Sequence, residues 1–273
     1  MPRRAYTLCC AIFLTSLGGC ASGPLIDTTY TSLAQDSRAR FLIIHYTAGG
    51  FAGSLKWLTE GPVSSHYLVN DNPPTIYRLV DDNRRAYHAG VSSWKGNTQL
   101  NASSIGIEIV NPGSKRTPDG QTWFDYPQDQ IDAVIALVKK IVKDHDIKPE
   151  RVLAHSDIAP QRKTDPGPRF PWKQLADAGL VLWPDAASVA QRRAGFEQQL
   201  PDVEWFQRTL SHHGFMAPTN GELDDETRNV IAAFQMKYRS ANFDGTPDAE
   251  TAALLDVLTS PWSAEAPIIS PKP

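Results

Sequence analysis

Cysteine is almost absent from the chain, and the few cysteines that it has lie at the N-terminal end. They are Cys9, Cys10 and Cys20, so residues 21–273 contain no thiol. No disulfide can therefore stabilise the main body of the protein, which excludes the small disulfide-stapled folds of secreted proteins. A cysteine nucleophile is excluded there as well, and no Gly-x-Ser-x-Gly segment is present to carry a serine nucleophile.

An excess of positive charge and a membrane-length apolar run are also lacking. The 27 basic and 30 acidic residues give a formal net charge of −3, so nucleic acid is not expected as a partner. The apolar run at about residues 5–17 is too short to span a bilayer. With 41% hydrophobic and 21% charged residues, the composition is typical of globular proteins, and the length indicates one or two domains.

The first twenty residues have the shape of a secretory signal. Arg3 and Arg4 precede the apolar run, and the segment ends in Leu17, Gly18, Gly19 and Cys20. This ending resembles the lipobox of bacterial lipoproteins, in which the cysteine is lipidated and becomes the mature N-terminus. We expect residues 1–19 to be a signal peptide, with an ordinary cleaved signal or a buried apolar element as the alternatives.

A lipidated Cys20 implies attachment to a membrane. Several acyl chains on one cysteine bury enough CH₂ groups for stable anchoring. The following residue is Ala21 rather than Asp, which in similar lipoproteins implies delivery to the outer membrane. The expected location is therefore the outer membrane of a Gram-negative bacterium, facing the periplasm, with residues 20–38 as a tether.

Short β-rich segments and one long helical pattern follow. Strands are expected at residues 41–46, 66–69, 75–79, 105–110 and 152–155, which are rich in Ile, Val and aromatic residues. A helix is expected at 128–144, where apolar residues recur at intervals of three and four after Pro127. A sheet with helices packed on it buries these faces most simply.

The C-terminal part contains a repeat. The pattern Gly221-x₄-Glu226-Thr227 recurs as Gly245-x₄-Glu250-Thr251, a period of 24 residues, and each copy leads into an apolar helical run. Another helical run precedes the first copy. The pattern predicts a small all-α three-helix domain at 198–259, joined by a linker at 183–197. The last residues, 260–273, hold four prolines and are expected to be disordered.

Two histidines stand at the ends of predicted strands, where functional side chains are common. His45 follows the apolar run 41–44 of the first expected strand, and His155 follows the run 152–154 of the last one. A catalytic zinc ion needs about three protein ligands and an open position for water, and Asp165 could supply the third ligand. The spacing of two histidines and an aspartate over this length is by itself not specific.

Several motifs together resemble the zinc N-acetylmuramoyl-L-alanine amidases of type 2, the AmpD-like family. The match extends over about residues 36–180, which places the catalytic domain at 39–182. The segments that carry the resemblance are Ile43-Ile44-His45-Tyr46-Thr47, His88-Ala89-Gly90, Leu100-Asn101 with Ser104 to Asn111, His155 to Pro160, and Asp165-Pro166-Gly167. The family fold is a mixed central β-sheet flanked by helices, of the α/β class.

The resemblance implies roles for individual residues. His45, His155 and Asp165 match the ligands of one Zn²⁺ ion, Glu108 matches the glutamate that activates water, and Lys163 matches the cation beside the reacting carbonyl. The strand pattern agrees, because Ile105, Ile107 and Ile109 can face the core while Glu108 faces the other side. A solvent-facing glutamate or a salt bridge is the alternative for Glu108.

The implied reaction is hydrolysis of the amide between N-acetylmuramic acid and L-alanine in peptidoglycan or muropeptides. Substrate-binding candidates are Tyr46, His66, His88, Trp94 and Asn111, since sugars stack on aromatic faces; packing is the alternative for the aromatic residues, and a core position for His66. The C-terminal repeat resembles the three-helix peptidoglycan-binding module of wall hydrolases. No obligate protein partner is expected.

Three other functions are compatible with parts of this pattern. The protein could bind peptidoglycan without cleaving it, could link the outer membrane to the wall as a structural lipoprotein, or could be a zinc peptidase that cuts within the stem peptide. The presence of all three ligands together with Glu108 and Lys163 argues against the first. Zinc content and activity would distinguish the second, and product analysis the third. The sequence leaves open whether intact or 1,6-anhydro substrates are preferred.

Overall fold

The computed structural model describes residues 23–118 and 120–260 in two units, one ending at Gln35 and the other beginning at Asp36. The expected signal peptide, Cys20 and residues 261–273 lie outside the described residues. In the first unit, residues 23–35 contain neither helix nor strand. Among the described residues, no helix is both long enough and apolar enough to cross a membrane.

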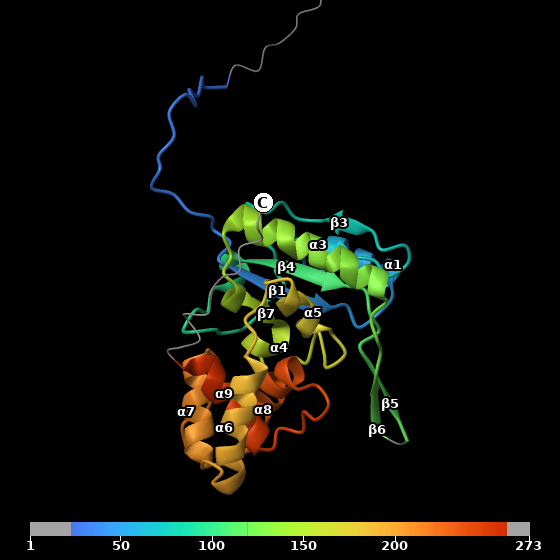
Figure 1. Ribbon diagram of the computed structural model, residues 1–273. Coiled ribbons are helices and arrows are strands. Elements are labelled where there is room, and N and C mark those ends of the chain that lie inside the picture. Colours follow the sequence, from blue (N-terminus) through green and yellow to red (C-terminus); the bar gives the residue numbers. More distant parts are fainter. Residues whose placement is uncertain (1–22, 119, 261–273) are drawn as a thin grey trace, which may run out of the picture. The chain divides into compact units, whose positions relative to one another are not determined.

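A five-stranded mixed sheet forms the centre of the second unit, with the order β3-β2-β4-β1-β7 (Figure 1). Its strands are β1 (Phe41–Tyr46), β2 (Tyr67–Val69), β3 (Ile76–Arg78), β4 (Ser104–Ile109) and β7 (Val152–Ala154). β1 pairs in parallel with both β4 and β7, and β2 is parallel to β4, whereas β3 is antiparallel to β2. The expected strands and the mixed α/β fold are therefore confirmed.

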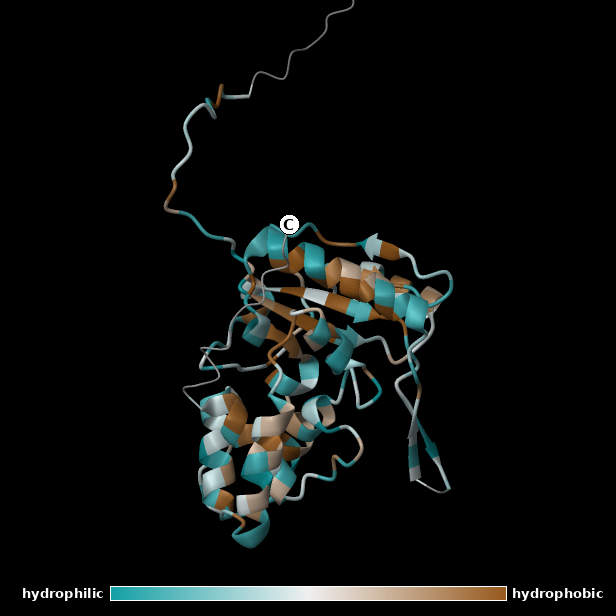
Figure 2. Ribbon diagram, in the orientation of Figure 1, coloured by the Kyte–Doolittle hydropathy of each residue, from teal (hydrophilic) through white to brown (hydrophobic). Residues whose placement is uncertain are grey.

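One face of this sheet is a conventional apolar core. Alternate residues of β1, β4 and β7 point to it and pack against helix α3 (Gln128–His145) and helix α5 (Trp172–Asp177). Two residues of β2 join them, so the strand members of this core are Leu42, Ile44, Tyr67, Val69, Ile105, Ile107, Ile109, Val152 and Ala154. Hydrophobic residues are concentrated along these strands in Figure 2. α3 ends one residue later than expected, because Asp146 adopts a left-handed conformation that terminates the helix.

The opposite face of the sheet holds the polar residues His45 and Glu108 as well as apolar residues. Ile43 and Leu153 pack against the C-terminal helices, while Leu68 packs against helix α1 (Phe51–Glu60). His45 and Glu108 belong to the same face, since side chains alternate along a strand and Cα of His45 is in register with that of Glu108. The predicted orientation of Glu108, away from the isoleucine core, is therefore confirmed.

Short elements and one hairpin complete the catalytic part. Helix α2 (Leu100–Ser103) leads into β4, strands β5 (Ser114–Thr117) and β6 (Gly120–Trp123) form a separate hairpin, and the 3-10 helix η1 (Pro149–Arg151) leads into β7. Helix α4 (His155–Ile158) follows β7 directly. His155, expected as the last residue of a strand, is therefore the first residue of a helix.

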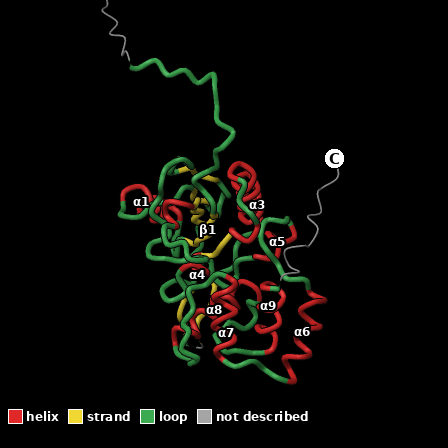
Figure 3. The backbone as a smooth tube through the Cα atoms, turned by 90° about the vertical axis from the view of Figure 1, so that its left-hand side faces the viewer, coloured by secondary structure: helices red, strands yellow, loops and turns green. Residues whose placement is uncertain are grey.

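In the described residues after 182, four helices lie together in Figure 3: α6 (Ala186–Gln198), α7 (Val203–His213), α8 (Asp225–Tyr238) and α9 (Ala249–Thr259). Three of them were expected. The fourth, α6, occupies the segment that the sequence predicts as a linker. Asp185 caps this helix, which packs along α9. None of its residues is fully buried, so its polar sequence has no apolar stripe that would predict a helix.

The sequence repeat corresponds to a repeated hydrogen-bond pattern. Gln207 on α7 accepts a hydrogen bond from the backbone N–H of Gly221 and donates one to the hydroxyl of Thr227. Gln235 on α8 makes the same two bonds one repeat later, with Gly245 and Thr251 as partners. Because both glutamines are buried, these bonds satisfy polar groups that would otherwise be costly inside the helical domain.

Candidate metal centre and active site

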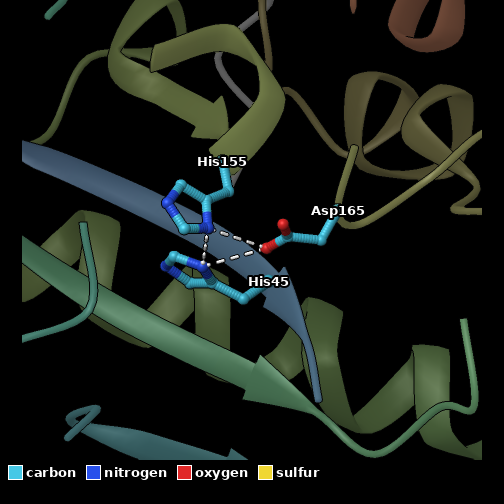
Figure 4. A group of neighbouring side chains, drawn as sticks. All are labelled: His45, His155 and Asp165. Atoms are coloured by element: carbon cyan, nitrogen blue, oxygen red, sulfur yellow. Dashed lines mark hydrogen bonds and ion pairs between the residues drawn. The ribbon is translucent and has the colours of Figure 1, made fainter. Parts of the chain in front are cut away.

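Three side chains from separate parts of the chain meet beside the sheet (Figure 4). His45 extends from β1, His155 is the first residue of α4, and Asp165 lies in the loop that follows. The backbone N–H of Ser156 donates to the carbonyl of Asp165, which ties this loop back to α4. All three residues are buried, with 6% or less of their surface exposed.

The three inward atoms form a nearly equilateral triangle. His45 Nδ1 lies 2.9 Å from His155 Nδ1 and 3.1 Å from Asp165 Oδ2, and His155 Nδ1 lies 3.0 Å from the same oxygen. Ligands at 2.0–2.1 Å in a tetrahedral site are separated by about 3.3 Å. A small divalent cation therefore fits this donor set, which has two neutral nitrogens, one anionic oxygen and room for a fourth ligand.

A chain of hydrogen bonds leaves Nδ1 of His45 free to bind a metal. Ser104 Oγ donates to the carbonyl of Leu100, so it accepts from His88 Nε2 at 3.1 Å. His88 Nδ1 then has a lone pair, which accepts from His45 Nε2 at 3.0 Å. Burial lowers the pKa of His45 to about 4, so its imidazole is neutral at pH 7 and its Nδ1 lone pair points at the triangle.

The loop that carries His88 also orients the second histidine. His155 Nε2 lies 3.2 Å from the carbonyl oxygen of Ala89, so it donates there and leaves its own Nδ1 free to bind a metal ion. Asn101 Oδ1 accepts from the backbone N–H groups of both His88 and Ala89 and fixes the loop. His88 was expected to bind substrate; although it lines the groove, its two ring nitrogens are engaged behind the metal centre.

The absence of a side chain at Gly106 makes room for His88. A Cβ atom at this position would lie 2.5 Å from His88 Cγ and 2.7 Å from its Nδ1. Substituting Gly106→Ala is therefore expected to displace the ring from His45 and to weaken metal binding, measured with Zn²⁺, by about 10- to 100-fold. Gly195→Ala, on α6 with nothing within 4 Å of its added Cβ, is the matched control. Equal Zn²⁺ affinity in the two variants would show that His88 does not orient His45.

A groove of about 550 Å³ opens beside these donor atoms. Tyr46, Glu108 and Lys163 line it together with His155 and Asp165. The hydroxyl of Tyr46 lies 3.2 Å from Thr164 Oγ1, which holds the ring against the loop of Asp165. The structure therefore brings two expected metal ligands, the expected base and the expected cation to one cavity. The third expected ligand, His45, contacts the other two at 2.9 and 3.1 Å.

Electrostatics distinguish the two carboxyl groups of this site. Burial raises the pKa of Glu108 well above its usual value, the Asp165 carboxylate adds to the effect, and Lys163 opposes it. Burial would also raise the pKa of Asp165, but its contacts with His155 and His45 outweigh burial and hold the pKa below the usual range. Asp165 is thus suited to be an anionic ligand, and Glu108 to exchange protons.

Comparison with known proteins agrees with this geometry. Residues 35–168 match the family model described as N-acetylmuramoyl-L-alanine amidase, and residues 199–255 match a peptidoglycan binding domain. The chain is 41% identical to the N-acetylmuramoyl-L-alanine amidase AmiD of Escherichia coli strain K12, over 96% of this chain and all of AmiD. The chain belongs to the N-acetylmuramoyl-L-alanine amidase family.

Solved structures of relatives have the same fold as this amidase. E. coli AmiD, in complex with the substrate anhydro-N-acetylmuramic acid-L-Ala-D-gamma-Glu-L-Lys, is 42% identical with a TM-score of 0.78, covering 85% of this chain and 93% of AmiD. AmpDh3 from Pseudomonas aeruginosa is 40% identical with a TM-score of 0.79, covering 86% and 98% of the two chains. The similarity extends over both the catalytic and the helical parts.

Three predicted substrate-binding residues of the amidase do not line the groove. His66 is buried, and its Nδ1 accepts from the backbone N–H of Gly106. Trp94 is 2% exposed and packs edge-on against Phe215, next to α7. Asn111 is buried, donating to the carbonyl of Asp125 and accepting from the N–H of Gly113. All three are occupied by packing or by hydrogen bonds within the fold.

Other residues that line the groove of the amidase were not predicted from the sequence. Trp57, on the outer face of α1, and Tyr87 are 59% and 54% exposed at the groove. Arg162 also lines it and donates to the carbonyl oxygens of Ala89 and Val91. Tyr87 and Arg162 could have been found from their positions beside His88 and Lys163, but no sequence pattern marks Trp57.

Proposed function

We propose that the amidase works with one zinc ion held by Nδ1 of His45, Nδ1 of His155 and Oδ2 of Asp165. The observation that carries this proposal is the 2.9–3.1 Å triangle of donor atoms at the wall of a groove that Glu108 also lines. Imidazole nitrogens with one carboxylate form a donor set that zinc favours, and three protein ligands leave a position for water.

When bound, zinc supplies Lewis-acid polarisation of the scissile carbonyl and acidifies a water molecule. Glu108 accepts the proton of the attacking water and then delivers it to the nitrogen of the leaving L-alanine. Its raised pKa favours both transfers, because a base with a pKa nearer the working pH accepts and releases a proton readily. No covalent enzyme intermediate is needed.

Lys163 supplies the cation for the negative charge that develops on the carbonyl oxygen. It lines the same groove, and its charge acts on both Glu108 and His45. Preorganised cations of this kind stabilise the transition state more than the ground state. Tyr46, anchored to Thr164, forms the adjacent wall.

The proposed substrates are muropeptides whose N-acetylmuramic acid is joined to L-alanine, including 1,6-anhydro forms. The named substrate of E. coli AmiD and the anhydromuramic pentapeptide bound to P. aeruginosa AmpDh3 support this choice. The exposed rings of Trp57 and Tyr87 at the groove provide flat apolar faces that suit a sugar.

Product analysis tests the proposal directly. The purified full chain, loaded with zinc, is incubated with an N-acetylmuramoyl pentapeptide and with its 1,6-anhydro form, and the products are identified by mass spectrometry. We expect free peptide with an N-terminal L-alanine, and no release after chelation until zinc is restored. Cleavage that survives complete zinc removal would overturn the metal assignment, and cleavage inside the stem would indicate a peptidase.

Trp57 offers a separate test of the groove. Trp57→Ala is expected to raise KM several-fold for a muropeptide that retains its sugar, with little change in kcat, because a stacking contact of about 1 kcal/mol acts on binding. Trp57→Phe should restore most of the affinity. If KM stays unchanged in the alanine variant, the sugar does not reach α1.

We further propose that the amidase is an outer-membrane lipoprotein anchored through Cys20, with its helical domain bound to peptidoglycan. The Leu17 to Cys20 sequence supports the anchor, and the match to a peptidoglycan binding domain supports the wall contact. Radiolabelled palmitate should be incorporated into the wild-type chain and not into Cys20→Ala. Incorporation that persists in the variant would exclude Cys20 as the lipidated residue.

A further inference from the structure

Lys237 is a buried lysine of helix α8 that no step of the reaction uses. Only 5% of it is exposed. Its Nζ donates to Asp157 Oδ2 at 2.7 Å and to the carbonyl of Val152 at 3.2 Å, and lies 4.6 Å from the ring centre of Trp172. All three partners belong to the catalytic domain, although Lys237 belongs to the helical domain. A buried charge is stable only with such partners, so this contact is specific.

These partners flank a metal ligand. Val152 begins β7, Asp157 is the third residue of α4, and His155 stands at the junction of the two elements. Asp157 Oδ2 also accepts from the backbone N–H of Ala154 at 2.8 Å, which closes the turn that starts α4. One ammonium group therefore contacts both elements that determine where the His155 imidazole lies.

Helix α4 depends on its surroundings for its orientation. It has four residues, fewer than a helix needs to be stable alone. Ile158 and the following Ala159 share an apolar cluster with Ile231 and Phe234 of α8. Beyond them, the side chain of Gln161 donates to the carbonyl of Glu226. The segment that presents His155 and leads to Asp165 is thus packed against the helical domain.

We infer that Lys237 is a positioning residue for the metal centre, acting on His155 through Asp157 and Val152, so that the helical domain is a structural part of this centre. The inference rests on the proposed zinc site. It gives the helical domain a second role beside wall binding, and it predicts that a change at the interface between the domains alters zinc affinity without touching a ligand.

The test compares zinc affinity and thermal unfolding in the full chain. Lys237→Met keeps the length of the side chain but removes its charge and its donors. We expect zinc affinity, measured by competition with a chromophoric chelator, to fall by about 10- to 100-fold, as for other residues that hold a ligand in place. The apo protein should also melt at a lower temperature, because Asp157 is left buried without its partner.

Two further variants separate positioning from general destabilisation. Leu255→Ala on α9 removes a fully buried side chain of the helical domain and should lower the melting temperature with zinc affinity unchanged. Asp157→Asn combined with Lys237→Met leaves no unpaired charge, so it is expected to fold; because it still lacks the donor to Val152, its zinc affinity should stay below that of the wild type.

The outcomes also distinguish this inference from the proposed function. If the wild type binds no zinc, the proposed centre fails. If the wild type binds zinc, and Lys237→Met and the double variant both fold and bind it as tightly as the wild type does, only the positioning role of Lys237 is overturned. An equal loss of zinc affinity in Leu255→Ala would likewise overturn it, since the effect would then follow stability alone.

Discussion

Replacing Glu108 by glutamine is expected to lower kcat by at least about 100-fold while the fold and the bound zinc are retained. Glutamine has almost the same shape as glutamate but cannot accept the proton of the attacking water. Turnover of an N-acetylmuramoyl peptide and zinc content would be measured on the same preparation. Glu60→Gln, at the exposed end of α1, is the matched control and should behave as the wild type. Near-normal turnover of Glu108→Gln would exclude Glu108 as the base.

The same substitution should stabilise the zinc-free protein at neutral pH. The usual pKa of a glutamate is 4.5, and burial raises that of Glu108 well above it, so ionisation of Glu108 destabilises the folded state. This cost begins as the pH rises through 4.5 and is complete above the raised pKa of the folded state. Glu108→Gln should therefore melt higher than the wild type at about pH 8 and equally at about pH 4. An equal rise in melting temperature at both pH values would show that the ionisation of Glu108 is not the cause.

Replacing His45 by alanine is expected to abolish activity and to weaken zinc binding by more than about 100-fold. Loss of a partner outside the coordination sphere already costs about 10- to 100-fold, and His45 is itself one of only three proposed ligands. Zinc content by atomic emission and turnover with added zinc are the measurements. His212→Ala, on the exposed side of α7, is the control for loss of a histidine.

One result would contradict the proposed coordination, and a second would contradict the expected loss of activity. If His45→Ala kept wild-type zinc affinity, the ion would be held elsewhere. If a high zinc concentration restored full turnover, His45 would contribute affinity but no essential geometry. Chelation of the wild type should reproduce the loss of activity reversibly, which separates metal loss from unfolding of the variant.

The local pattern of the chain was sufficient for much of the catalytic domain. Alternation in the strand of Ile105, Ile107 and Ile109 correctly placed Glu108 on the face opposite the core. The apolar period of α3 correctly gave its start at Gln128. Both succeed because strand and helix periods are local properties, fixed by which residues of one element must be buried together.

The roles of single polar and aromatic residues could not be predicted as well from the sequence. His88 and His66 belong to the same residue type, yet one supports His45 and the other accepts from the backbone of β4. Trp94 lies under the helical domain rather than in the groove. The partner of each side chain comes from a distant part of the chain, so no local pattern could assign it.

The sequence by itself determined the spacing of apolar residues in strands and helices and the residues at the turns. Its motifs also identified the residues that converge at the proposed metal centre. The tertiary structure decided the rest: that Nδ1 of both histidines faces the Asp165 carboxylate, that Gly106 leaves space for His88, that α6 is a helix, and that Lys237 reaches Asp157. Each of these depends on hydrogen bonds or packing between elements remote in sequence, whose energies exist only once the chain has folded.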